Sequence, residues 1–231
     1  MANDFITDYL KESLRRSKDQ QREYNLAGKI NLYIKDPLTR EVDVRNVMEK
    51  ISSTVPPHLL GEIDAIFVGM FDEFEEMQTN AMFKDGAIYL SNDQDDEQDM
   101  VDDIIHEIAH SIELPYGHII YGDGRIQDEF LAKRKKLFEI LKEEKLNPNK
   151  KLFMDPEYSK ELDFYLYEDV GYDRLNFICS SYGLFTSAYS ATSLREYFAN
   201  GFEYFFLDDR QYMSKICPQL YKKIEEIYDD Q

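Results

Sequence analysis

The chain has 231 residues, which is long enough for one large domain or two small ones. Its 46 acidic residues outnumber its 27 basic residues, and the resulting formal charge of −19 argues against nucleic acid and anionic membranes as partners. An apolar share of 43%, with 17 tyrosines and 15 phenylalanines, argues against disorder and predicts a sizeable core.

Apolar residues that alternate with polar ones predict strands, and apolar residues at helical spacing predict helices. In the first half of the chain we expect a polar helix over 4–25, a strand over 30–34, a helix from Asp43 to Pro56, and strands over 63–68 and 87–90. Further helices are expected over 97–113, 126–145, 159–168, 193–206 and 218–228. Because the strands come first and most helices come later, the predicted fold class is α+β.

Two further features concern the compartment. Cys179 and Cys217 match no metal-binding spacing and predict reduced thiols. The chain contains no apolar run of the kind found in signal sequences or membrane spans. The expected location is therefore the cytoplasm, with no membrane partner.

The predicted helix over 97–113 contains the motif His106-Glu107-x-x-His110. Histidines four residues apart lie on one helix face, so both imidazoles can reach a single zinc ion. Glu107 lies about 100° further round the helix, beside the metal, where it can take a proton from the attacking water. The apolar residues of this helix lie on the opposite face, so the motif is expected to face a cleft.

A catalytic zinc site needs a third protein ligand and one open position. The metzincin spacing would require glycine and histidine where Glu113 and Tyr116 stand, so that class is excluded. The two other histidines, His58 and His118, are expected to be surface or structural residues. A carboxylate from a separate helix is the remaining source, and Glu196 is the candidate, although a lone glutamate on a helix is commonly just a solvated charge.

The segments IIHEIAH and AYSATSLREYFANGF resemble the zinc peptidases of the anthrax lethal factor type, which include the bacterial Pro-Pro endopeptidases. This resemblance implies that one zinc ion per chain is held by His106, His110 and Glu196. It also implies that Tyr189, seven residues before Glu196, points at the substrate carbonyl. Asn200 stands where lethal factor has an acidic residue.

Over the whole chain, the features IYLSNDQDDEQDMVDDIIHEIAH and TSLREYF are similar to uncharacterised metallopeptidases of tailed phages. This resemblance implies a zincin-like fold, with a small mixed sheet packed on the active-site helix and a mostly helical C-terminal half. We expect a single domain over 1–231, made of a helix and sheet half (1–116), an inserted helical part (about 117–175) and a part that carries the third ligand (176–231). A phage protein would act in the host cytosol or belong to the virion.

The predicted activity is zinc-dependent endopeptidase cleavage of a protein or peptide, with Glu107 as the base and Tyr189 as a second donor to the carbonyl oxygen. Asn200 is expected to orient a ligand histidine. The substrate is expected to pair as an extra strand with four residues, Ala87, Ile88, Tyr89 and Leu90. Two alternatives remain open, namely a structural or interaction protein whose zinc ties two helices together and a regulatory peptidase that cleaves a repressor.

Overall fold

The computed structural model describes residues 24–26, 29–77 and 79–230. Most of the helix predicted over 4–25 lies outside this part of the chain, and the end of that range belongs to strand β1 (Tyr24–Leu26). The chain separates into two compact units, one that ends at Ser111 and one that begins at Ile112. The first contains a mixed sheet and the second is built from helices, so the α+β class is confirmed.

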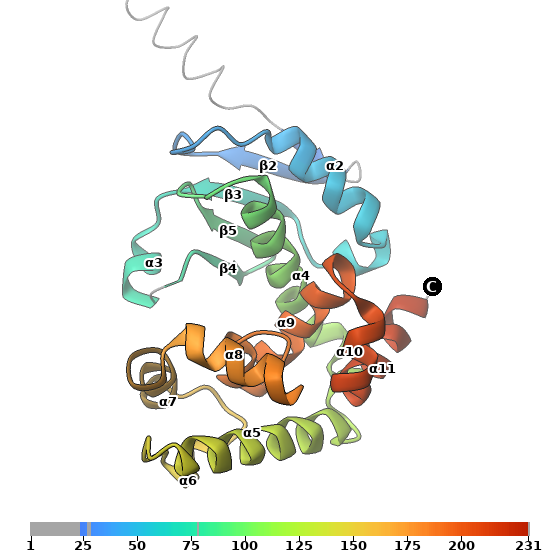
Figure 1. Ribbon diagram of the computed structural model, residues 1–231. Helices are drawn as coiled ribbons and strands as arrows, with labels where there is room; N and C mark the ends of the chain where they lie inside the picture. Colours follow the sequence, from blue (N-terminus) through green and yellow to red (C-terminus); the bar gives the residue numbers. More distant parts are fainter. Residues whose placement is uncertain (1–23, 27–28, 78, 231) are drawn as a thin grey trace, which may run out of the picture. The chain divides into compact units, whose positions relative to one another are not determined.

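The sheet has the strand order β1-β2-β3-β5-β4, which Figure 1 shows for the neighbours from β2 to β4. The remaining strands are β2 (Ile30–Ile34), β3 (Ala65–Gly69), β4 (Ala81–Lys84) and β5 (Ala87–Ser91). The three middle strands are parallel, and each outer strand pairs antiparallel with its neighbour. The strands predicted over 30–34, 63–68 and 87–90 are confirmed, whereas β1 and β4 are too short to show a pattern of alternation.

The two faces of the sheet differ in composition. Leu32, Ile66 and Ile88 are aligned across the middle strands and are fully buried, as a core face requires. The next residues along these strands, Tyr33, Phe67 and Tyr89, form a stacked row on the other face, with ring centroids 5.4 and 5.5 Å apart. Alternation along each strand thus separates an aliphatic face from an aromatic one.

A tight turn joins β4 to β5. Asp85 and Gly86 have φ angles of 50° and 78°, the left-handed values of a two-residue hairpin turn. The dipeptide Asp-Gly is typical of this turn type. As a consequence, β5 has a paired strand on each side, β3 on one and β4 on the other.

Helix α2 (Val44–Thr54) begins as predicted. The side chain of Asp43 accepts a hydrogen bond of 2.9 Å from the backbone N–H of Arg45, so it caps the first turn. The helix ends before Pro56, and a short 3-10 helix (Pro57–Leu60) follows. A further short helix, α3 (Asp72–Met77), comes between β3 and β4.

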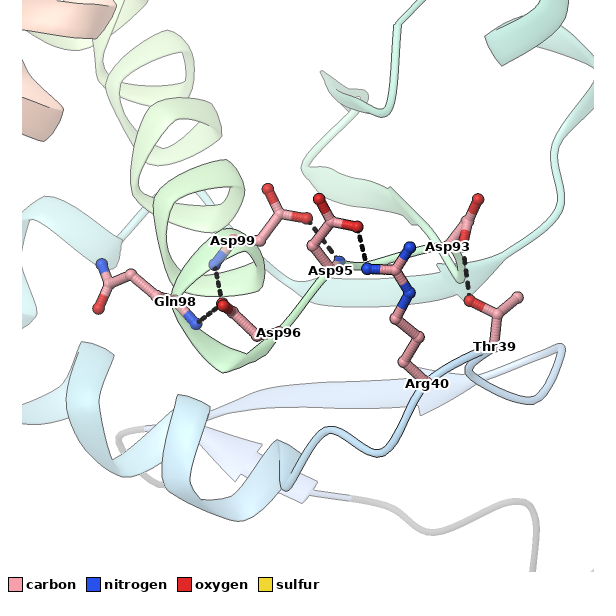
Figure 2. A network of polar contacts seen from close by, with 7 residues as sticks. All are labelled: Thr39, Arg40, Asp93, Asp95, Asp96, Gln98 and Asp99. Atoms are coloured by element: carbon pink, nitrogen blue, oxygen red, sulfur yellow. Dashed lines mark hydrogen bonds and ion pairs between the residues drawn. The ribbon is translucent and has the colours of Figure 1, made fainter.

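Acidic residues organise the beginning of α4 (Glu97–Ile120). Figure 2 shows the seven polar residues of this region: Thr39, Arg40, Asp93, Asp95, Asp96, Gln98 and Asp99. The carboxylate of Asp96 accepts from the N–H groups of Gln98 and Asp99, at 2.8 and 3.0 Å, and so satisfies donors that have no partner within the helix. These contacts fix where the helix that carries the His-Glu motif begins.

Helix α4 continues further than predicted, through Pro115 to Ile120. Proline removes one backbone hydrogen bond, but tertiary contacts can hold the turns around it. The hydroxyl of Tyr121 donates to the carboxylate of Glu113 over 2.9 Å, so a side-chain bond spans the proline.

The second unit consists of helices. They are α5 (Arg125–Glu143), α6 (Lys150–Phe153), α7 (Lys160–Phe164), a π-helix (Tyr165–Val170), α8 (Tyr172–Tyr182), a 3-10 helix (Tyr189–Ala191), α9 (Leu194–Leu207), α10 (Arg210–Ile216) and α11 (Pro218–Asp229). The helices predicted over 126–145, 193–206 and 218–228 are confirmed as α5, α9 and α11. The helix predicted over 159–168 is divided between α7 and the π-helix, and α6, α8 and α10 were not predicted.

One carboxylate connects three of these helices. Glu129 of α5 accepts from the hydroxyl of Tyr197 in α9 over 2.8 Å. It also accepts from the N–H groups of Gln219 and Leu220, at 2.9 and 3.1 Å. Because these two N–H groups lie in the first turn of α11, Glu129 acts as a cap supplied by another helix.

Two basic residues of α5 are buried. Lys133 donates to the carbonyl oxygens of Leu184 and Ile216, each over 2.5 Å. Arg134 donates to the carbonyl oxygens of Leu152 and Asp155, over 2.6 and 3.0 Å. These cations therefore satisfy acceptors at helix ends and in loops, instead of forming a basic surface.

Two observations bear on the predicted compartment. Cys179 and Cys217 are buried, and no disulfide joins them. Within the described residues, no helix is both long enough and apolar enough to cross a membrane.

Candidate metal centre

Helix α4 presents His106 and His110 on one face. Its opposite face consists of apolar residues that are at most 2% exposed, namely Val101, Ile104, Ile105 and Ile108. The two histidines are half-buried, and their ring centroids lie 5.1 Å apart with the ring planes at 72°. Burial of the apolar face thus fixes the helix in a rotation that brings the two imidazoles together.

Glu107 lies next to the histidines in a protected position. It is 6% exposed, a low value for a carboxylate. One turn earlier, the carboxylate of Asp103 accepts from the side-chain amide of Gln94 over 3.1 Å. Burial raises the pKa of Asp103 to about 6, and the hydrogen bond from Gln94 opposes this shift.

Helix α9 supplies the third candidate ligand, Glu196, from its first turn. The side chain of Ser193 caps the helix by accepting from the N–H of Glu196 over 3.1 Å. The first turn of α9 has a second backbone contact, in which the N–H of Leu194 donates to the carbonyl of Pro156 over 2.8 Å. A negative charge is favoured at this end of a helix, which suits an ionised glutamate.

His106, His110 and Glu196 form a cluster that could hold a metal ion. Each offers one ligand atom, and these atoms all lie within 4.8 Å of one another. Tetrahedral zinc with bonds near 2.1 Å would place them roughly 3.4 Å apart, so small side-chain rotations suffice. Two imidazoles and one carboxylate are the ligand set of one class of catalytic zinc sites.

The two other histidines do not join this cluster. Among the described residues, the group of His106, His110 and Glu196 is the one that brings three potential ligands this close. His118 is exposed near the end of α4, and His58 lies half-buried in the 3-10 helix that follows α2. The expectation of surface or structural positions agrees with these locations.

An ion pair lies close to the candidate ligands in the sequence. The Nε and a terminal nitrogen of Arg195 each lie 2.6 Å from one carboxylate oxygen of Glu113, whose other oxygen accepts from Tyr121. Burial lowers the pKa of Arg195, but the charge of Glu113 and its hydrogen bond outweigh this effect and raise that pKa. Burial and the charge of Glu113 raise the pKa of Tyr121, so its hydroxyl remains a donor.

Asn200 is 8% exposed, so it does not face solvent. Its amide nitrogen donates to the carbonyl of Glu196 over 2.9 Å, and its side-chain oxygen accepts from Ser187 over 2.5 Å. Asn200 therefore joins α9, the helix that carries Glu196, to the segment before Tyr189. Its predicted bond to a ligand histidine stays a prediction.

Replacing Asn200 with alanine is expected to weaken zinc binding about 10-fold. The substitution removes the hydrogen bonds to the carbonyl of Glu196 and from Ser187, and these bonds support the helix that carries the ligand Glu196. Competition with a chromogenic chelator would measure the change. Ser180→Ala is a suitable control, because Ser180 is exposed and donates only to a backbone carbonyl within α8. Unchanged affinity in Asn200→Ala would reject this role.

Tyr189 begins the 3-10 helix that precedes α9 and is 36% exposed. Its carbonyl accepts from the N–H of Thr192 over 3.0 Å and from the hydroxyl of Thr192 over 2.8 Å. The partial exposure leaves its ring accessible, whereas its neighbours Ser190 and Ala191 are buried. A fixed backbone and an accessible side chain suit a residue that contacts a ligand.

The pairing of β5 corrects the prediction for a substrate strand. Ala87, Ile88, Tyr89 and Leu90 lie inside the sheet and are paired with β3 and β4. A peptide cannot add to a strand whose two sides are both occupied. Among the described strands, β4 lies at this edge of the sheet instead.

Several residues near the candidate ligands were not predicted. The carboxylate of Asp103 lies one turn before His106, a helical spacing that could have identified it. The ion pair of Glu113 with Arg195 and the bond of Ser187 to Asn200 depend on tertiary contacts, for which no local pattern exists.

Comparison with models of protein families, with curated proteins and with solved structures gives no match for this chain.

Proposed function

We propose that the protein is a zinc-dependent endopeptidase. The observation that carries this proposal is the cluster of His106 and His110 of α4 with Glu196 of α9, together with the buried Glu107 that follows His106. This ligand set leaves room for a fourth position. A purely structural zinc usually has four protein ligands, often cysteines, and has no need of Glu107.

When bound, zinc would lower the pKa of a coordinated water to about 7 and polarise a substrate carbonyl. Glu107 acts as the general base, taking a proton from the attacking water and delivering it to the departing amine. Its burial keeps bulk water away from the carboxylate, which strengthens its interactions. His106, His110 and Glu196 act as the ligands.

The partner is a protein or peptide that binds in an extended conformation. Such a chain needs backbone partners at a free sheet edge, and β4 provides one within the described sheet. The buried, unbridged thiols suit the cytosol as the place of action.

Tyr189→Phe is expected to lower kcat by about 100- to 1,000-fold, because the carbonyl oxygen loses a phenol donor as negative charge develops on it. Zinc content and the melting temperature should not change, and KM should change little. Steady-state kinetics on a cleaved peptide would measure the effect. Tyr182→Phe is a matched control, because Tyr182 is also exposed and lies at the end of α8. If Tyr189→Phe has the kcat of wild type, the hydroxyl of Tyr189 has no catalytic role and its ring serves only in packing.

A single experiment tests the proposed function. The metal content of the purified protein is measured, and the protein is incubated with a random peptide pool whose products are identified by mass spectrometry. We expect about one zinc per chain and internal cleavage that a chelator abolishes. Zinc without cleavage would instead favour a scaffold in which the metal ties helices together, such as a virion component. A chain without metal would overturn the proposal.

A further inference from the structure

Glu113, Arg195 and Tyr121 form a connected group, here called the clamp, whose position suggests a role in metal binding. Glu113 lies one turn after His110 on the continuous helix α4. Arg195 immediately precedes Glu196 in the first turn of α9. The clamp therefore joins the two helices that carry the candidate ligands, next to the ligands themselves.

We propose that Glu113 and Arg195 are positioning residues that set the place of Glu196 for the metal, with Tyr121 holding the carboxylate of Glu113 in orientation. This inference rests on the proposed zinc site and adds residues that neither bind the metal nor react.

The geometry of the pair supports a positioning role. Two nitrogens of Arg195, Nε and one terminal nitrogen, lie 2.6 Å from the same oxygen of Glu113, which restricts the rotation of the guanidinium. Tyr121 donates to the other oxygen over 2.9 Å, so both carboxylate oxygens are engaged. Lysine offers a single ammonium group and could not reproduce the two-nitrogen contact.

The burial of the pair is unequal. The side chain of Glu113 is 11% exposed, whereas that of Arg195 is 62% exposed. An ion pair with one exposed partner contributes little to the stability of the fold. The two-nitrogen contact is therefore better explained as a device that positions the first turn of α9 than as a contribution to the stability of the fold.

A second contact holds the other flank of the same helix end. The N–H of Leu194 donates to the carbonyl of Pro156, so the first turn of α9 is tied on one side through its backbone and on the other through Arg195. Glu196 directly follows these two attached residues in sequence and lies in the same turn. Releasing the Arg195 contact removes the attachment of this turn to Glu113 of α4.

The test measures zinc affinity in Glu113→Gln, Arg195→Met, Arg195→Lys and Tyr121→Phe by chelator competition, together with the melting temperature of the zinc-free proteins. We expect Glu113→Gln and Arg195→Met each to bind zinc about 10- to 100-fold more weakly, which is typical for groups that support metal ligands. Tyr121→Phe and Arg195→Lys should lose less. The zinc-free melting temperatures should remain close to wild type.

The chain offers a matched control in Arg174→Met. The guanidinium of Arg174 lies 2.6 Å from Glu144, and both side chains are partly exposed, at 47% and 36%. This pair has the same closest distance as the clamp but no candidate ligand beside it in sequence. Zinc affinity in Arg174→Met should equal that of wild type.

The double variant Glu113→Gln/Arg195→Met should bind zinc about as weakly as either single variant, because each substitution already breaks the same pair. Wild-type affinity in both single variants, or losses that multiply in the double variant, would overturn the clamp. Failure of the proposed function is distinguishable, because it would appear in the wild-type protein as missing zinc or missing cleavage, whereas failure of the clamp leaves zinc binding by wild type intact and appears only in the variants.

Discussion

Glu107→Gln is expected to retain zinc and the melting temperature of wild type but to cleave peptides about 100- to 10,000-fold more slowly. The amide has nearly the same shape as the carboxylate and cannot accept the proton of the attacking water. Glu107 is 6% exposed, so bulk solvent cannot easily replace it as a base. Turnover of a peptide identified from the random pool, with zinc content measured on the same sample, would quantify the loss.

The matched control for this variant is Glu139→Gln. Glu139 is an exposed glutamate of α5, so the same loss of one negative charge should leave cleavage unchanged. Comparable cleavage by Glu107→Gln and wild type would remove the general base and, with it, the endopeptidase mechanism.

Glu196→Ala is expected to lose most of the bound zinc during dialysis, because only the two imidazoles of His106 and His110 remain as protein ligands. Elemental analysis after dialysis would measure the metal remaining per chain. Glu113→Ala provides the contrast. At saturating zinc this variant should still bind one zinc ion per chain, because the substitution removes a positioning residue and retains all three ligands. Full zinc content in Glu196→Ala would show that another group completes the site.

The part of the fold nearest the histidine motif was the most predictable. Helix α4 combines a capped acidic beginning, an apolar face and the motif His106-Glu107-x-x-His110, and all three signals are local in sequence. Only its end was wrong: the helix was expected over 97–113, but it continues through Pro115 to Ile120. Local patterns do not reveal tertiary contacts such as that between Tyr121 and Glu113.

The third ligand was less predictable. In the sequence alone, Ser193 and Glu196 have the spacing of a helix-capping pair, and a role in capping would explain the glutamate without a metal. Its selection depended on the resemblance to a peptidase family. The cluster with His106 and His110 gives an independent reason, since spatial proximity, unlike helix periodicity, separates a ligand from a solvated charge.

The substrate strand illustrates why position in the sequence was insufficient. The segment over 87–90 precedes α4 in the sequence. This position predicted a strand that is open to a peptide. Strand β4 (Ala81–Lys84) is only four residues long and shows no clear alternation, so its pairing with β5 could not be foreseen. Which strand forms an edge is a property of the whole sheet.

The carboxylate of Glu129 also has a consequence for local unfolding. It accepts hydrogen bonds from Tyr197 and from the first turn of α11, so α5, α9 and α11 share a single half-buried acceptor. If α11 detached, Tyr197 would keep its bond but Glu129 would lose the two amide donors and be left with an incompletely compensated charge. Opening one helix therefore weakens the attachment of the others. In amide hydrogen exchange, these three helices should behave as one cooperative unit, with protection shared among segments far apart in the chain.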